Sequence, residues 1–519
     1  MSNSHRFNLR EIKNNKQWAS AVADEIISLD KNANLFTTAA GISPSGIVHF
    51  GNFRDIITSH MVREALEEKG KKARLIFSWD NFDRLRKVPT GVPETYSEHI
   101  GKPLSKIPDP FGNLPSYAER FQTHFIAAMK LLGIDIEYRD QTILYESGIY
   151  DDMIKLTLLK RKQIAAILLS FMTEKAMAEK NIDPISYSEN FYPISIYSRF
   201  TGKDITKILE YDNDMSIKYL CIETGKEDNV NLRIDHIAKL NWKIDWPMRW
   251  QYEKVHFEPG GSDHAAPGGS YDVSSVIAKE IFDHTPPVFV EYMFVGIQGL
   301  GSKMSGSKGN AVSPSDLLDI YEPSLLKWLY LRKAPNQSFE LAFNTEVYRQ
   351  YDEYDADRTE IKAIPFRQLV GLGQIVQWQE NKLFAIVEEL GLDYNKKTIS
   401  LRLPLARNWL AKYNPTELIA LNNNTNNTYV ETLTQEQKAR VKLLRDELTS
   451  KKHTSIADLE FLVYQIPKKS NLTETELKKE QRAFFKDIYN LLIGKDTGPR
   501  LGTFLWAVDR TQIIKLLNI

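Results

Sequence analysis

The sequence contains a single cysteine, Cys221, has no net charge, and has no apolar run long enough to cross a membrane. One cysteine excludes an intrachain disulfide and a multi-cysteine zinc site. The 67 basic residues balance 67 acidic ones, so a nucleic-acid partner would need a local basic face. The longest apolar run, around 164–172, is far shorter than the ~20 residues of a membrane helix. The polar N-terminal residues lack the apolar core of a signal peptide, so we expect a cytoplasmic protein.

The 519 residues are too many for one ordinary domain and predict two or three. Hydrophobic periodicity and turn signals predict strands over 35–40, 73–79, 134–138 and 288–295, and helices from Asn52 to about 69, over 116–132 and over 151–180. The region 183–235 is rich in Tyr, Asp and Gly and reads as an irregular insertion. After residue 313 the pattern is almost wholly helical. The early strand–loop–helix–strand unit is typical of a parallel α/β sheet.

A first motif, Pro44 to Asn52, follows the first predicted strand. Gly46 and Gly51 permit close backbone approach to a ligand, and a helix that starts near Asn52 presents free N–H groups to an anion. His49 and Asn52 are three residues apart and can donate to the same phosphate. The alternative is that His49 is only a helix cap or a satisfied surface group.

A second motif, Lys303 to Asn310, lies in a glycine-rich loop after the last predicted strand. Lys303 and Lys308 could neutralise the charge on the phosphates as pyrophosphate leaves, and the glycines would let such a loop close over a nucleotide. The competing interpretation is a solvated basic loop with no ligand. Together the two motifs indicate a site for the phosphates of a nucleotide, and the family resemblance that they carry implies that this nucleotide activates a carboxylate.

The two motifs resemble the "HIGH" and "KMSKS" signatures of the class I aminoacyl-tRNA synthetases. Asn52 stands where the first signature has its second histidine, and Gly306 stands where the second has its usual catalytic lysine. Either Lys308 replaces that lysine or Lys303 acts alone. By the resemblance the catalytic residues would be His49, Asn52, Lys303 and Lys308. The ATP-binding set would be Pro44, Ser45, Gly46, His49, Gly51, Asn52, Gly261, Asp263, Met304, Ser305 and Ser307.

Two further blocks, 80–89 and 246–264, make the chain similar to one family of this class, the class I lysyl-tRNA synthetases. The resemblance is strong over about 35–312 and only architectural beyond. It implies ATP, Mg²⁺, L-lysine and tRNA-Lys as reaction partners. It also implies a lysine pocket, which Gly41, Ser43, Trp246 and His264 would line.

Asp80 is our own addition to that pocket. It follows a predicted strand at its carboxyl end, where a buried ε-ammonium group would need an anion. The alternative is that Asp80 caps its loop or pairs with Arg84 or Arg86. Some relatives carry paired cysteines in the insertion, which suggests zinc, but Cys221 is alone here and we predict no zinc.

The resulting prediction is an α/β chain whose Rossmann-like, parallel-sheet nucleotide-binding domain is split by an insertion and followed by an all-α C-terminal domain. The predicted segments are an N-terminal extension (1–34), the two halves of the catalytic domain (35–150 and 236–312), the insertion (151–235), a helical junction (313–345) and an anticodon-binding domain (346–519). We expect a monomeric lysine–tRNA ligase with no membrane partner. The alternatives are a synthetase for another amino acid such as glutamate, a non-catalytic tRNA-binding paralogue, and a small-molecule nucleotidyltransferase.

Overall fold

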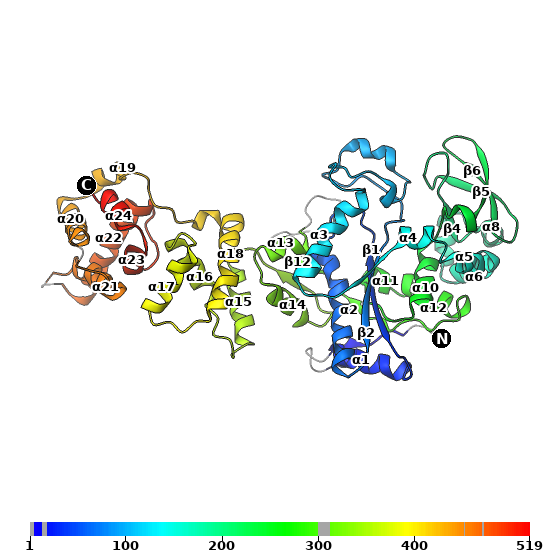
Figure 1. Cartoon of the computed structure of the whole chain (residues 1–519), viewed down its shortest axis with the longest axis horizontal. Coiled ribbons are helices and arrows are strands. Elements are labelled where there is room, and N and C mark those ends of the chain that lie inside the picture. The colour runs from blue at the N-terminus through cyan, green and yellow to red at the C-terminus, as the bar shows by residue number, and fades with distance from the viewer. Residues whose placement is uncertain (1–4, 13–17, 299–311, 451, 470–471) are drawn as a thin grey trace. The chain divides into compact units, whose positions relative to one another are not determined.

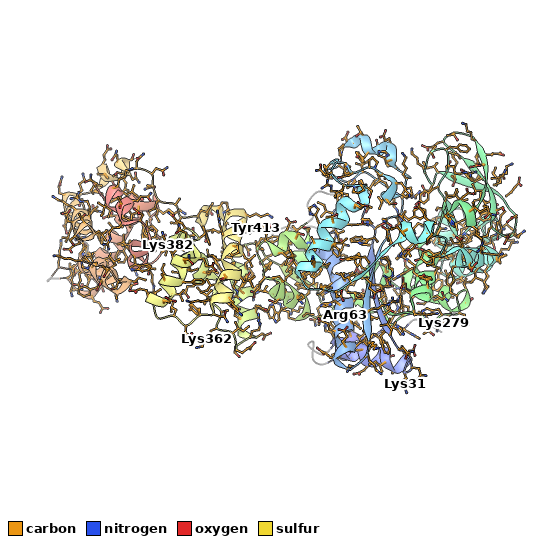
Figure 2. The ribbon with its side chains drawn as sticks, in the orientation of Figure 1. Lys31, Arg63, Lys279, Lys362, Lys382 and Tyr413 are labelled. Carbon is orange, nitrogen blue, oxygen red and sulfur yellow. The ribbon has the colours of Figure 1, made fainter. Side chains whose placement is uncertain are left out.

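The computed structural model describes residues 5–12, 18–298, 312–450, 452–469 and 472–519. The chain forms two compact units (Figure 1). Unit 1 comprises Met1–Leu317 and Leu326–Leu341, and unit 2 comprises Leu318–Leu325 and Ala342–Ile519. Charged side chains such as Lys31 in unit 1 and Lys362 and Lys382 in unit 2 lie exposed at the surface (Figure 2).

Unit 1 is built on a parallel sheet with the strand order β3-β2-β1-β9. Its strands are β1 (Phe36–Ile42), β2 (Ala73–Trp79), β3 (Glu137–Asp140) and β9 (Val255–Phe257). Val288 continues the sheet through a parallel bridge to Phe257, and β10 (Gly260–Gly261) pairs in parallel with β11 (Glu291–Tyr292). The first five residues of β1 are buried, as expected for a parallel strand covered on both faces.

Helices cover this sheet because each has one apolar face to bury. Val22 and Ile26 of α1 (Trp18–Leu29) pack with Val62 and Leu66 of α2 (Phe50–Glu68) in one buried cluster. Other helices of unit 1 are α3 (Tyr117–Leu131), α4 (Gln141–Glu146), α9 (Leu232–Asp235), α10 (Trp242–Glu253), α11 (Ser262–Ala265), α12 (Ser270–Glu280) and α13 (Pro314–Leu318). Helix α14 (Pro323–Leu331) precedes β13 (Phe339–Leu341), which pairs with β12 (Val295–Ile297).

The prediction of an irregular insertion over 183–235 was wrong. The region contains an antiparallel sheet of β5 (Thr206–Tyr211), β6 (Ser216–Cys221) and β7 (Glu227–Asn231), and β4 (Ile194–Ile196) pairs with β8 (Ala238–Leu240). Ile217, Tyr219 and Cys221 are buried on one face of β6 while the residues between them are partly exposed. That two-residue period is the signal of a half-buried strand, which the many polar residues obscured.

Two other predicted elements are interrupted. The helix expected over 151–180 is three helices, α5 (Asp151–Leu159), α6 (Arg161–Ser170) and α7 (Glu174–Glu179), followed by α8 (Pro184–Asn190). The Thr173 side chain accepts from the Ala176 N–H and starts α7 as a new helix. The strand expected over 288–295 divides into β11 and β12, since Met293 N–H turns to the Pro335 carbonyl. The strand expected at 134–138 is β3, which begins later, at Glu137.

Unit 2 is helical throughout its described residues, apart from connecting loops. Its helices are α15 (Glu346–Ala356), α16 (Phe366–Ile375), α17 (Glu380–Glu389), α18 (Lys396–Tyr413), α19 (Asn427–Thr432), α20 (Gln435–Thr449), α21 (Ile456–Gln465), α22 (Glu474–Ile493), α23 (Leu501–Ala507) and α24 (Arg510–Leu516). The buried Arg402 of α18 pairs with Glu322 at 3.0 Å and with Asp355 at 2.5 Å. The predicted fold class, a Rossmann-like parallel sheet followed by helices, is confirmed.

Candidate active site

Several predicted site residues lie at one edge of the parallel sheet, where its strands end. Gly41 and Ser43 lie at the end of β1, and Asp80 directly follows β2. Gly261 and His264 follow β9 on the other side of β1. The chain leaves β1 for β2 on one side and reaches β9 on the other, so this edge is the switch point at which open α/β sheets bind ligands.

His49 is both the cap of α2 and a donor. Its Nδ1 accepts from the Gly51 N–H at 3.1 Å, while the Asn52 Oδ1 accepts from the His49 N–H at 3.3 Å. Burial lowers the pKa of His49, so the ring is neutral near pH 7. Because Nδ1 accepts, the single ring proton sits on Nε2. The cap interpretation therefore holds without excluding a ligand, because Nε2–H remains a donor beside the helix N-terminus.

The first motif is held by contacts that leave little freedom. Ser45 N–H donates to the Ser43 carbonyl at 2.8 Å, and Tyr117 of α3 donates its hydroxyl to the Ser45 carbonyl at 2.9 Å. Pro44 is buried and Gly46 is partly exposed at this turn. A Cβ on Gly51 would lie 2.8 Å from the imidazole Cε1 of His49, so only glycine leaves that ring in place.

The second motif lies outside the described residues, and with it Lys303, Met304, Ser305, Ser307 and Lys308. The chain re-enters the described part at Val312. There the Val312 carbonyl accepts from the Phe50 N–H at 2.8 Å, at the first residue of α2. The chain that follows the second motif is therefore hydrogen-bonded to the first turn of the helix that carries His49 as its cap.

The middle block surrounds a group of aromatic rings. The His264 ring centre lies 5.7 Å from that of Trp246, which is 4% exposed. Asp263 is exposed, and a Cβ on Gly261 would lie 2.8 Å from its Oδ1. Trp246 and His264 thus come close together although they belong to separate helices. Asp263 is exposed to solvent, and its carboxylate lies close to the Gly261 backbone.

A buried cluster of charges lies beneath the same edge. Arg249 of α10 bonds to Asp80 at 2.6 Å and to Asp245 at 3.2 Å. Lys239 bonds to Asp245 at 3.1 Å and to Asp83 at 3.0 Å. These three carboxylates exceed the two cations by one negative charge.

The ionisation of this cluster follows from burial and pairing. Burial raises the pKa of Asp80, which Arg249 partly offsets. Burial acts in the same direction on Asp83, but Lys239 and the Ser43 hydroxyl, 2.9 Å from its Oδ2, leave its pKa lowered. Burial alone would lower the pKa of Lys239, yet the carboxylates, Asp245 foremost, raise it. Lys239 and Asp83 are therefore both charged at neutral pH.

Asp80 pairs with neither of the arginines named as alternatives. Arg84 bonds to Asp204 at 2.9 Å, and the partner of Asp80 is Arg249. Sequence reasoning had placed Arg249 only within an aromatic block and had missed Lys239 and Asp245. A charged residue between two tryptophans, as Arg249 is, was the available signal, because a buried cation needs a buried anion.

A second group of acids flanks β1. Asp55 of α2 accepts from the Gly41 N–H at 3.3 Å, and burial raises its pKa. Glu258 accepts from the Trp250 indole N–H at 2.6 Å, and burial raises its pKa to about 7. Neither acid was predicted as a site residue.

Glu258 should make stability depend on pH. Its pKa is about 7 when folded and 4.5 in the unfolded chain, so the folded state binds more protons between these values. The free energy of unfolding of wild type is expected to fall relative to Glu258→Gln as pH rises from about 4.5 to 7, by about 2–3 kcal/mol. Urea unfolding at pH 5 and pH 8 measures this, with Glu340→Gln, an exposed position, as control. Equal pH slopes in wild type and Glu258→Gln would refute it.

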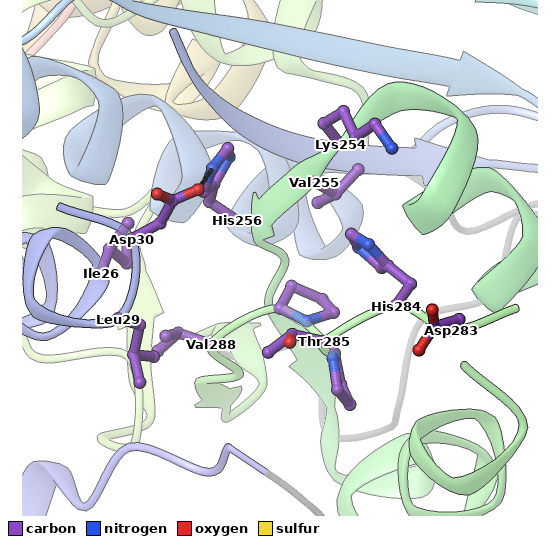
Figure 3. Close-up of a pocket in the computed structure, with 12 residues that line it drawn as sticks. Ile26, Leu29, Asp30, Lys254, Val255, His256, Asp283, His284, Thr285 and Val288 are labelled. Carbon is purple, nitrogen blue, oxygen red and sulfur yellow. Dashed lines mark ion pairs between the residues drawn. The ribbon is translucent and has the colours of Figure 1, made fainter. Parts of the chain in front are cut away.

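One cavity of the described structure lies away from this edge of the sheet. It has a volume of about 310 Å³ and is lined by Asp30, His256 and His284 among others (Figure 3). It includes Val255, the first residue of β9, and so opens at the amino ends of the strands. None of the predicted site residues lines it, and it lies at the opposite ends of the strands from the edge that carries the first motif.

In the part of the chain that the structure describes, no three His, Cys, Asp or Glu side chains are placed to hold a metal ion. Cys221 is buried in β6. None of the described helices is long and apolar enough to span a bilayer.

Comparison with known proteins decides the family. The profile described as "tRNA synthetases class I (K)" matches residues 16–370. A lysine–tRNA ligase of Streptomyces coelicolor is 35% identical, over 96% of this chain and 98% of that protein. One from Pyrococcus horikoshii is 33% identical, over 97% of this chain and 99% of that protein. The chain belongs to the class I lysyl-tRNA synthetases.

Within this family the resemblance noted from the motifs is confirmed, and it extends over both units. The match to the Pyrococcus protein covers nearly the full length of each chain, including the helical C-terminal third. Among solved structures, the methionyl-tRNA synthetase of Mycobacterium tuberculosis aligns with a TM-score of 0.37 at 11% identity, over 88% of this chain and 91% of that chain.

Proposed function

We propose that this synthetase activates L-lysine with ATP, giving lysyl-adenylate and pyrophosphate, and then transfers the lysyl group to the 3′ end of tRNA-Lys. Family membership supports the reaction. The observation that carries it is the position of two features at one sheet edge. The donor-bearing N-terminus of α2 follows β1, and the acid-rich cluster includes Asp80 and Asp83, which follow the neighbouring strand β2. An anionic nucleotide requires hydrogen-bond donors and a cationic amino acid requires an anion, and this edge of the sheet supplies both.

Catalysis in this proposal needs positioning and charge stabilisation but no protein nucleophile. The lysine carboxylate attacks the α-phosphorus of ATP and pyrophosphate leaves. The Nε2–H of His49, the Asn52 amide and the free N–H groups of α2 donate to the phosphate oxygens as charge develops. Lys303 and Lys308 would neutralise the leaving pyrophosphate. We assign no protein ligand to Mg²⁺ and propose that it arrives bound to the triphosphate.

For the remaining nucleotide contacts we propose the predicted set. Gly261 would admit the adenine, and Asp263 would bind the ribose hydroxyls, for which its exposure leaves it accessible. Pro44, Ser45, Gly46 and Gly51 would shape the backbone around the triphosphate. Met304, Ser305 and Ser307 belong to the same proposal from the second motif.

Lysine selectivity follows from the acid-rich cluster. We propose that the excess carboxylate over Arg249 and Lys239 attracts the substrate ε-ammonium, with Asp80 as its nearest anion. Asp80 would share its charge between Arg249 and the substrate, because its Oδ1 already bonds to Arg249. Gly41, Ser43, Trp246 and His264 would line the rest of the lysine site. A glutamate side chain would meet the same negative excess and be repelled.

Asp80→Asn should raise the KM for lysine by about 10- to 100-fold and change the KM for ATP little. The amide keeps the size of the carboxyl group but loses the charge-assisted bond, which is worth about 1.5–3 kcal/mol. Steady-state kinetics measure both constants. Asp204→Asn removes a similarly buried, arginine-paired carboxylate outside the cluster and serves as the control. A parallel rise in both KM values would argue against a specific lysine contact.

The function itself is tested by ATP–pyrophosphate exchange with each of the twenty amino acids, with and without tRNA. Exchange with lysine alone among them is the expected result. Exchange with glutamate would make the chain a synthetase of different specificity, and no exchange under any condition would make it a non-catalytic tRNA-binding paralogue.

The remaining parts take roles that the family suggests. We propose that 35–150 and 236–312 form the catalytic domain around the insertion 151–235, with 1–34 as an extension and 313–345 as a junction. The helical segment 346–519 would bind the anticodon. We propose that the enzyme acts as a monomer in the cytoplasm, where its tRNA is found.

A further inference from the structure

A second cavity, of about 280 Å³, borders the first motif. Gly46 and Ile47 of the motif loop form one wall, and His124 of α3 belongs to another. Its walls are Gly46, Ile47, Pro89, Thr90, Gly91, Val92, Phe111, Arg120, Phe121 and His124. Most of this surface is apolar, and the volume suits one small planar group. No residue of the predicted ATP or lysine sets lines it except Gly46.

Phe111 is an exposed aromatic side chain that the fold nevertheless holds in place. It is 50% exposed, and the Arg120 guanidinium lies 5.2 Å from its ring centre. Asp109 accepts from the Phe111 N–H at 3.1 Å and binds Arg120 through two bonds, of 2.9 and 2.6 Å. One side of the ring is thus occupied by a fixed cation while half of the side chain remains accessible.

Asp109 fixes the rest of the loop as well. Its Oδ2 accepts from the N–H groups of Asn113 and Leu114 at 3.0 and 2.9 Å. Arg120 foremost, with these backbone bonds, holds the pKa of Asp109 far below its usual range, so the anchor stays charged. Ordering an exposed apolar ring costs side-chain entropy, which burial of the ring does not offset. A ring ordered before binding is what a stacking surface needs.

The surroundings of the cavity fit a nucleic acid. Arg86 and Lys87 are exposed and directly precede the Val88–Pro89 segment that leads into the cavity wall. Ser315 lies shortly after the second motif, and its hydroxyl donates to the His124 carbonyl at 3.2 Å. Helix α3, which forms one wall of the cavity, is therefore in contact with the chain that follows the second motif. A rigid aromatic surface with basic side chains nearby is the usual platform for an unpaired base.

We propose that this cavity binds an unpaired base of the tRNA 3′ end, which stacks on the accessible face of Phe111 while Arg86 and Lys87 approach the adjoining phosphates. The inference rests on the proposed function, because that function supplies the single-stranded end. A base bound here lies beside the Gly46–Ile47 turn that leads to His49, so the acceptor end is directed to the place where the adenylate forms.

The test is a double cycle of binding measurements with the full-length protein at fixed salt. Wild type and Phe111→Ala are each titrated with tRNA-Lys that ends in CCA and with transcripts shortened by one, two or three 3′ nucleotides. Phe111→Ala is expected to weaken binding of intact tRNA by about 5- to 100-fold, the range for stacking one base on an aromatic ring. Wild type should lose a similar factor when the stacked nucleotide is removed, and the variant should lose no more.

Phe200→Ala is the matched control, since Phe200 is 42% exposed and has Lys226 5.5 Å from its ring centre, yet lies outside the cavity. It should bind every transcript as wild type does. Phe111→Tyr should retain binding. The inference fails if Phe111→Ala binds intact tRNA as wild type does. It also fails if the variant loses as much affinity as wild type does when the 3′ nucleotides are removed. Lysine charging by wild type is unaffected by either result. If wild type charges no tRNA, the proposed function fails instead.

Discussion

His49→Ala is expected to slow lysyl-adenylate formation by about 10²- to 10³-fold, or roughly 3–4 kcal/mol of barrier, with little change in the KM for lysine. The reason is the fixed tautomer. With Nδ1 occupied by the Gly51 N–H, the ring presents Nε2–H beside the N-terminus of α2, where charge develops on the phosphates. ATP–pyrophosphate exchange in the presence of tRNA measures the rate.

Loss of the cap must be separated from loss of the donor. His49→Asn supplies a side chain that caps helices well but lacks the reach of Nε2, so it should be as slow as His49→Ala while α2 stays stable. Gly51→Ala keeps the imidazole but displaces it, since the new Cβ would lie 2.8 Å from its Cε1. It should also be slow. His453→Ala, in unit 2, is the control and should support exchange at the wild-type rate. A wild-type exchange rate in His49→Asn would show that His49 acts only as a cap.

Arg249→Met is expected to destabilise unit 1 by about 3–5 kcal/mol. Arg249 is 7% exposed and bonds to both Asp80 and Asp245, so its removal leaves two buried carboxylates with less compensation. The midpoint of urea unfolding, followed by tryptophan fluorescence, is the measurement. Trp246 and Trp250 flank the substituted position and report on it directly.

Two further variants show whether charge is the cause. Arg84→Met removes an arginine whose side chain is 49% exposed in its pair with Asp204, and it should cost less than about 1 kcal/mol. Adding Asp80→Asn to Arg249→Met should recover part of the lost stability, because it removes one of the uncompensated charges. If the double variant is no more stable than Arg249→Met, loss of packing rather than of charge is responsible.

Local sequence patterns predicted the secondary-structure elements well where a single signal, such as an apolar run, was clear. The strand 73–79 was predicted with its observed bounds because its apolar run has a clear start and stop. The helix after the first motif was found through its buried spacing, and its start was misplaced by only two residues, since His49 rather than a later residue caps it. The antiparallel sheet 206–231 was missed because its alternation is carried by few apolar residues between many polar ones.

The sequence by itself determined the family, the order of the fold's parts and the presence of His49, Asn52 and the lysine-bearing second motif, because these depend on residue type and local spacing. Only the tertiary structure decided which charges neutralise one another. Asp80 and Arg249 are 169 residues apart and Phe111 is orientated by Arg120, pairings that arise when separate strands and helices pack. The interaction energy of two buried charges depends strongly on the distance between them, because solvent screens them weakly. No local sequence pattern encodes that distance.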